Sequence, residues 1–285
     1  MHIPENFILL LGTLAYMSAL VITWVRLSRG KEPLHGTNLI LILAGWFLQS
    51  FGLWLLGMEA RSCPVRNPFQ VLQFISWSIV ILYLFTGQVF RLSLFGSGSA
   101  TLAAIIGLVA FLLPGATQTE FSHIGGNPRI EAHAAMAFLS YGIFGLLAVL
   151  SALYLLQNYS LKTKKYAGIF RFLPSIVEMD TVLLRLLIVA SLMFTVSVGI
   201  GALYWIEHLK DLALPKLIFT VSLWIAYWIV LILRLSYKLH GSRLAWTCIG
   251  LFIIALFILW PVEASRDHGV PQAMISKHIS PDDVA

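Results

Sequence analysis

Apolar residues are gathered into eight long runs, separated by short polar connections. The runs cover residues 7–25, 36–57, 69–90, 99–117, 133–157, 181–206, 214–233 and 244–261. Most hold about 20 residues, the length that a helix needs to cross the hydrocarbon core of a bilayer. In lipid, only a helix satisfies its own backbone hydrogen bonds segment by segment. The pattern predicts an all-α integral membrane protein, a bundle of about eight transmembrane helices.

Composition supports this fold class. The chain is 59% hydrophobic and only 11% charged, whereas about a quarter of the residues of a soluble domain are charged. The first run follows "MHIPENF", which has no basic segment, and it is longer than the apolar core of a signal peptide. We therefore expect it to remain as a helix. We expect residues 1–262 to form one transmembrane domain and residues 263–285 a short exported tail.

The basic residues predict the orientation. Most of the 19 Lys and Arg residues lie in the connections after the first, third, fifth and seventh runs. By the positive-inside rule, those connections face the cytoplasm and both termini face the exported side. We expect a multi-pass protein of the inner (cytoplasmic) membrane. The net charge of +6 then reflects this bias, and no nucleic-acid partner is expected.

Sequence motifs give no support for catalysis. The chain has two cysteines, Cys63 and Cys248, and no C-x-x-C-H motif for covalent haem attachment. It also has no glycine-rich phosphate loop, nucleophile elbow or H-E-x-x-H zinc motif. We expect a protein that is not a stand-alone enzyme.

One histidine stands where an exported connection meets a membrane run. His133 follows Arg129 and Glu131 in "NPRIEAHAAMAFLSYG", and Tyr141 comes two helical turns later on roughly the same face. A neutral imidazole is a metal or haem ligand when its second nitrogen is held by a partner. The alternative is an interfacial histidine that only makes hydrogen bonds.

Aromatic residues near the last two runs are candidates for a porphyrin wall. Trp224 and Trp228 are spaced i,i+4 and share a helix face, and Tyr204 marks the outer interface. The tryptophans are equally explained by packing against a neighbouring helix. Gln49 lies near the middle of the second run, where a polar side chain faces the bundle and indicates either function or helix association.

Several segments carry a family resemblance. "HAAMAFLSYG", "LPSIVEMDTVLLRLLIVASLMFTVSVGIGALYW", "PKLIFTVSLWIAYWIVLILRL" and "LHGSRLAWTCIGLFIIALFIL" resemble the cytochrome c assembly family, which includes CcsA, CcmC and HemX-like membrane proteins. The likeness covers about residues 60 to 265. The outer connection after residue 206 lacks the tryptophan-rich W-G-x-x-W-x-W-D motif of the family. This difference indicates the shorter HemX-like branch.

The resemblance implies a haem-binding or haem-presenting membrane component of cytochrome c assembly. Its cofactor would be non-covalent haem, and its partners would be haem and other cytochrome c maturation proteins in the bilayer. In the family, two exported histidines ligate the iron. His133 matches the first, and His268 stands near the second, with His208 and His123 as substitutes. Trp224, Trp228 and Tyr204 would then hold the macrocycle.

Two other hypotheses stay open. The first is a non-catalytic accessory or regulatory protein of another membrane complex, such as a transporter or a tetrapyrrole-synthesis enzyme, that does not bind haem. In that case Gln49, Gly199 and Gly201 serve helix packing. The second is a small-solute permease, which is less well supported because neither a pair of broken helices nor a buried charge is visible in the sequence.

Overall fold

The computed structural model describes residues 5–31, 34–60, 63–65, 67–90, 93–113, 128–163, 175–207 and 214–267, apart from some side chains at helix ends. All regular secondary structure in these ranges is α-helical. The helices are α1 (Glu5–Ser28), α2 (His35–Ala60), α3 (Pro68–Phe90), α4 (Ser93–Leu112), α5 (Pro128–Thr163), α7 (Ile176–Glu207), α8 (Leu214–Leu235) and α9 (Gly241–Asp267). Within the described residues, eight helices are long and apolar enough to cross a membrane. The predicted fold class is confirmed.

The fourth helix is shifted toward the N-terminus relative to its predicted run. We expected residues 99–117, whereas α4 begins at Ser93 and ends at Leu112. The polar residues that begin α4 are buried in the bundle, with Ser99 fully covered and Ser97 6% exposed, so hydropathy underestimates this end. At the other end, Pro114 follows closely in the sequence. Because the residue before a proline disfavours helical backbone angles, the helix stops there.

Local chemistry sets several helix ends. The Asn67 side chain accepts a hydrogen bond from the Gln70 N–H (2.8 Å), which caps the start of α3, and Pro68 takes the first helical position, where no N–H is needed. At the end of α1, Gly30 has a φ of 66°. The Lys31 N–H then reaches the Arg26 carbonyl at 2.9 Å, the closure that a left-handed residue allows.

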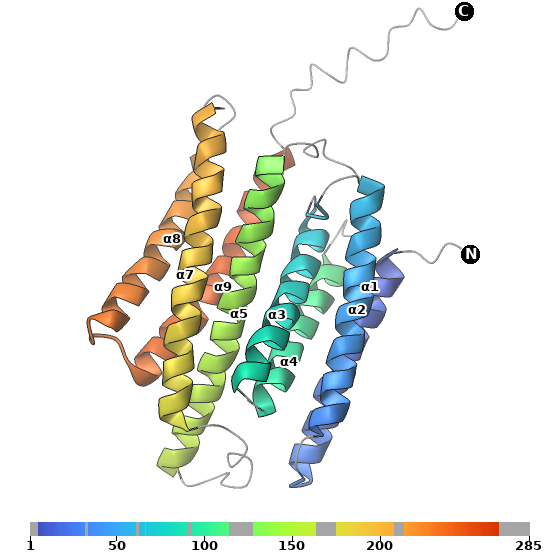
Figure 1. The fold of residues 1–285 in the computed structure, drawn as a ribbon, viewed down its shortest axis with the longest axis vertical. Coiled ribbons are helices and arrows are strands. Elements are labelled where there is room, and N and C mark those ends of the chain that lie inside the picture. Colours follow the sequence, from blue (N-terminus) through green and yellow to red (C-terminus); the bar gives the residue numbers. More distant parts are fainter. Residues whose placement is uncertain are drawn as a thin grey trace, which may run out of the picture.

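The helices run alternately up and down, so the start of α1 and the end of α9 lie toward the same end of the bundle (Figure 1). They form two groups. Helices α1 to α4 pack together, as do α5, α7, α8 and α9, and the groups meet where α5 contacts α3 and α4. The α5 helix contacts helices of both groups and is the centre of the bundle.

The middle of α5 is buried on every side, from Ser140 to Ser151. Small residues let neighbouring helices come close. A Cβ at Gly142 would lie 2.7 Å from the Ser78 Cβ, and one at Gly145 would lie 3.0 Å from the Ile79 side chain. A helix that is apolar or small all round is expected in the interior of a bundle. This burial fixes the position of the N-terminal end of α5, which carries His133.

Polar side chains join the helices of the first group. The Gln49 amide donates to the Gln73 side-chain oxygen (2.8 Å) and accepts from the Tyr16 hydroxyl (3.0 Å). The Gln73 amide donates onward to the Gly107 carbonyl (3.2 Å). These contacts link α1, α2, α3 and α4 through groups with no exposed surface. The expectation that Gln49 faces the bundle is confirmed, and its contacts are those of helix association.

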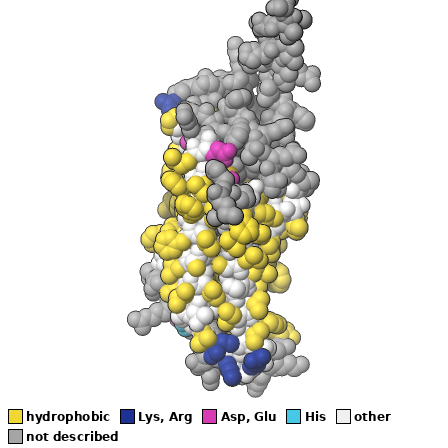
Figure 2. All heavy atoms as spheres, turned by 90° about the vertical axis from the view of Figure 1, so that its right-hand side faces the viewer, with side chains coloured by type: hydrophobic (Ala, Val, Ile, Leu, Met, Phe, Trp, Pro, Cys, Tyr) yellow, Lys and Arg dark blue, Asp and Glu magenta, His cyan; other side chains and the backbone are white. Residues whose placement is uncertain are grey.

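Apolar side chains cover the outside of the helices. Figure 2 shows the surface over α1 and α2, which has an apolar middle and basic side chains gathered at one end. Arg26, Arg29 and Lys31 are the basic residues at the end of α1. Exposed residues on α2 include Phe47 (63%) and Trp54 (56%). Such a surface suits lipid as the surrounding solvent.

Replacing Gln49 with leucine should lower the stability of the bundle, because Tyr16 and Gln73 would keep buried polar groups without their partner. We expect a loss of about 1 kcal/mol in unfolding free energy, the usual size for an interhelical hydrogen bond in a membrane protein. Thermal unfolding in detergent measures it. The control is Phe47→Leu on the lipid-facing side of the same helix. Equal melting temperatures for the two variants would contradict the structural role of Gln49.

Candidate functional site

His133 lies in the second turn of α5 and turns toward α7. Its Nδ1 is 2.7 Å from the backbone carbonyl oxygen of Ser197. The Ser197 hydroxyl donates to the backbone carbonyl of His133 (3.0 Å) and lies 3.2 Å from Nδ1. The imidazole is half-buried, whereas Ser197 is fully covered. The site is therefore formed by the N-terminal end of α5 and the C-terminal part of α7, which are far apart in sequence.

The Ser197 carbonyl determines which ring nitrogen carries the proton. A carbonyl oxygen only accepts hydrogen bonds, so Nδ1 is the donor in this contact. In the neutral imidazole, the lone pair is then on Nε2. A backbone carbonyl that fixes the tautomer in this way is the usual second partner of a histidine that ligates a metal. The contact with the Ser197 carbonyl is of the kind that orients a ligating histidine.

Tyr141 also faces α7, two turns deeper. It is 6% exposed, and its ring meets the edge of Phe194 on α7, with centroids 6.3 Å apart. Phe194 also packs edge-on against Phe144, with centroids 5.7 Å apart. Below His133, the α5–α7 interface is therefore a closed aromatic layer.

The first turn of α5 is tied to the connection between α2 and α3. The Glu131 carboxylate accepts a hydrogen bond from the backbone N–H of Cys63 (3.3 Å). Burial raises the pKa of the Cys63 thiol to about 11, and the nearby Glu131 carboxylate adds to the rise because it opposes a second negative charge. At neutral pH, Cys63 is therefore a thiol with little nucleophilic thiolate.

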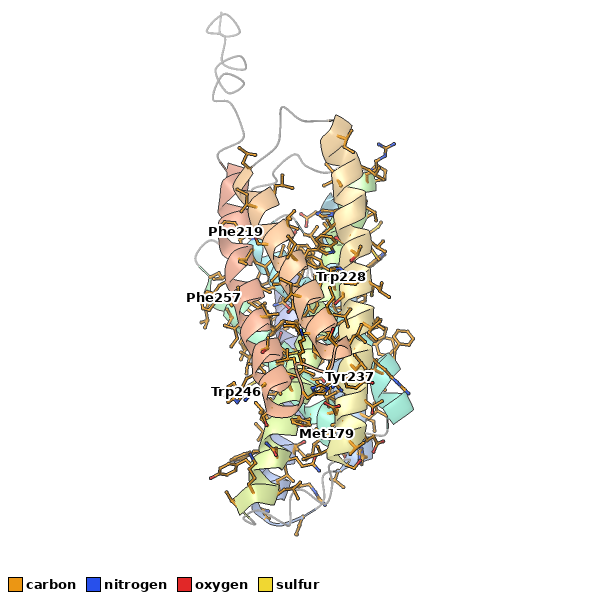
Figure 3. All side chains as sticks on the ribbon, turned by 90° about the vertical axis from the view of Figure 1, so that its left-hand side faces the viewer. Met179, Phe219, Trp228, Tyr237, Trp246 and Phe257 are labelled. Carbon is orange, nitrogen blue, oxygen red and sulfur yellow. The ribbon has the colours of Figure 1, made fainter. Side chains whose placement is uncertain are left out.

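The predicted tryptophans belong to α8 and contact another face of α7. Both indole N–H groups donate to the Thr195 hydroxyl, Trp224 at 2.9 Å and Trp228 at 3.0 Å, and that hydroxyl donates to the Ser191 carbonyl. Thr195 and Ser197 are two residues apart, which is about 200° around a helix. Figure 3 shows Trp228 on the side of α8 that faces α7. The structure therefore does not bring the tryptophans together with His133.

The remaining predicted residues have less structural detail. His268, His208 and His123 lie outside the described residues. Tyr204 lies in the last turn of α7, but its side chain is outside the described part. In the described part of the chain, no group of three or more His, Cys, Asp or Glu residues is placed to hold a metal ion. His133 is the predicted ligand whose surroundings are visible.

Comparison with known families completes the picture. Residues 65–263 match the family described as cytochrome C assembly protein, and this match covers more than half of the chain. The chain belongs to the cytochrome C assembly protein family. The matched region begins just before α3 and ends within α9, so the family region contains α5, α7 and His133, whereas α1 and α2 precede it.

Individual relatives of the cytochrome C assembly protein family agree with this assignment. The chain is 27% identical to protein HemX of Brevibacillus brevis over 58% of its length and 60% of that protein. It is 26% identical to protein HemX of Bacillus subtilis (strain 168) over 75% of its length and 80% of that protein. It is also 26% identical to the cytochrome c biogenesis protein CcsA of Cyanidium caldarium over 60% of its length and 59% of that protein. The matches span less than two thirds of the Brevibacillus and Cyanidium proteins. The predicted family and its HemX-like branch are confirmed.

Sequence reasoning missed three features of this family member. Ser197 was not recognised, and Gly201 was considered only for helix packing, although the Ser-x-x-x-Gly spacing places both on one face of α7. An ion pair between Asp180 of α7 and Arg234 of α8 was also missed. Each of these charges lies at the edge of an apolar run, where it looks like a loop residue. Arg234 is nevertheless only 8% exposed.

Replacing Glu131 with glutamine should speed alkylation of Cys63. With a pKa of about 11, only about one thiol in a thousand is ionised at pH 8, and removing the carboxylate lowers that pKa. The measurement is the pH dependence of maleimide labelling in a Cys248→Ala background. We expect the rate in the wild type to rise up to about pH 11, and the Glu131→Gln profile to shift to lower pH. If the profile keeps its position and only its plateau rises, the change is one of access rather than charge.

Proposed function

We propose that this protein binds non-covalent haem at the outer ends of α5 and α7 and presents it during cytochrome c biogenesis. The observation that carries the proposal is the 2.7 Å contact between His133 Nδ1 and the Ser197 carbonyl, which gives Nε2 the lone pair of the neutral ring. Membership of the cytochrome C assembly protein family and the likeness to CcsA support a role in cytochrome c biogenesis.

The role of the chain in this proposal is positional rather than catalytic. His133 would hold the iron through Nε2, and His268 would supply the second ligand. Ser197 holds the imidazole so that it does not rotate. The closed aromatic layer of Tyr141 and Phe194 excludes water from the α5–α7 interface below the ring. Bound haem would supply an iron centre whose reduction potential depends on these axial ligands and on burial.

The proposed orientation places the outer ends of α5 and α7 on the exported side of the inner (cytoplasmic) membrane, together with both termini. The distribution of Lys and Arg supports this orientation. In this arrangement, His133 faces the compartment in which apocytochromes receive haem. Other membrane proteins of cytochrome c maturation would be its partners.

One observation favours the second candidate function, an accessory protein that does not bind haem. Trp224 and Trp228 use their indole N–H groups on Thr195, so they pack α8 against α7 and do not face His133. With the tryptophan-rich outer motif also missing, an aromatic wall for a macrocycle has less support than a histidine ligand. In this case the partner would be another membrane complex, such as a transporter or a tetrapyrrole-synthesis enzyme.

Absorption spectra of the purified protein separate the two functions. For the haem function we expect a Soret band with reduced α and β bands, at about one haem per chain. His133→Ala should remove at least about nine tenths of the bound haem, because a ligand is lost. The control is His35→Ala, an exposed residue at the opposite end of the bundle, which should bind haem like the wild type.

Two results would decide against haem binding at His133. One is a folded wild-type protein, prepared from haem-replete cells, that holds no haem and takes up none when it is added. The other is a His133→Ala variant with the haem content of His35→Ala. If haem is bound and lost as expected, the spectrum of His268→Ala then tests the second axial ligand, with a change from a low-spin to a high-spin spectrum expected.

A further inference from the structure

The His133 ring is held against one face of α7 by two small residues spaced i,i+4. Ser197 contacts Nδ1 through its carbonyl oxygen and the His133 backbone through its hydroxyl. Gly201 lies beside the same ring, one turn farther along α7. Residues spaced i,i+4 share a helix face, so Ser197 and Gly201 form a continuous support for the imidazole.

The short distance between α7 and the His133 ring requires a glycine at position 201. A Cβ at this position would lie 2.8 Å from both Cε1 and Nδ1 of His133, and 3.4 Å from Cγ. Contacts below 3.0 Å are far inside van der Waals separation for carbon. An alanine would therefore push the imidazole away from α7. This movement would break the Nδ1–H contact with the Ser197 carbonyl, since both contacts involve the same edge of the ring.

Gly199 offers a natural comparison on the same helix. A Cβ at Gly199 would have no other atom within 4 Å, and this residue lies on the exposed side of α7. Both glycines lie in the last turns of α7, so an alanine has the same effect on helix propensity at either one. The two substitutions differ in whether the new methyl group meets His133.

We infer that Gly201 and Ser197 are positioning residues for the iron ligand: they select Nε2 of His133 as the ligating atom and fix the direction in which it points. The inference rests on the proposed function, since it assigns the orientation of the same histidine. Gly201 leaves room for the ring, and the Ser197 carbonyl accepts a hydrogen bond from the nitrogen that carries the proton. A ring freed from this support would sample other rotamers and both neutral tautomers.

The first arm of the experiment is done on haem-free protein. Diethyl pyrocarbonate acylates unprotonated imidazole nitrogens, and mass spectrometry of the peptide that contains His133 follows its rate. We expect Gly201→Ala to react about fivefold faster than the wild type, because its ring no longer rests on α7. We expect Gly199→Ala to react at the wild-type rate.

The second arm measures haem. Gly201→Ala should lose about tenfold or more in haem affinity, the usual effect of removing a group that orients a ligating histidine, and the haem that remains should have an altered reduction midpoint. Gly199→Ala should keep the wild-type affinity and midpoint. Ser197→Ala keeps the carbonyl but loses the hydroxyl, so its rate and affinity should lie between those of the two glycine variants. It also serves as the test if Gly201→Ala does not fold.

The outcomes separate this inference from the proposed function. If His133→Ala loses haem while Gly201→Ala and Ser197→Ala both behave like Gly199→Ala in both arms, haem binding stands and the positioning role is wrong. If the wild type binds no haem, the proposed function fails, and a positioning role for an iron ligand fails with it. If haem is bound and only Gly201→Ala and Ser197→Ala change in both arms, the positioning role is established.

Discussion

Hydrocarbon offers no hydrogen-bond partner, and this constraint decides how the polar side chains of the bundle are used. Gln49 and Gln73 have no exposed surface, and their side chains form a hydrogen bond between α2 and α3. The Thr195 hydroxyl accepts hydrogen bonds from two indole N–H groups and donates one to the Ser191 carbonyl, one turn earlier in α7. Arg234 of α8 pairs with Asp180 of α7. Each of these side chains contacts a neighbouring helix, so these contacts also set helix positions.

His133 is subject to the same constraint at the end of the bundle where α5 begins. Small residues in the middle of α5 let α3 and α9 come close, whereas α7 packs along α5 with Gly201 beside the His133 ring. A ring on that face must use its N–H within the interface, and the nearest acceptor is the Ser197 carbonyl. The tautomer of His133 is therefore a consequence of helix packing. The ligand chemistry proposed for this ring depends on how close α7 lies, more than on the charged residues around His133.

Hydropathy alone predicted the fold class, because a bilayer requires long apolar runs that can be recognised along the chain. The position of His133 near the start of an apolar run was equally visible. Its partners were not, since Ser197 is 64 residues away and the pairing depends on the register between α5 and α7. The Asp180–Arg234 pair was missed for a related reason. Single charges at the edges of apolar runs resemble loop residues until packing brings two of them together.

The tryptophans illustrate the limit of reasoning from one helix. Their i,i+4 spacing correctly placed them on one face of α8, but it gave no information about which neighbour that face meets. The face meets Thr195, about 200° around α7 from Ser197. Helix α7 thus stands between His133 and the indoles, with α5 on one side and α8 on the other. The indoles of α8 help to fix the position of α7, and α8 also contacts α5 directly, where Tyr227 stacks on Phe144 with ring centroids 3.6 Å apart.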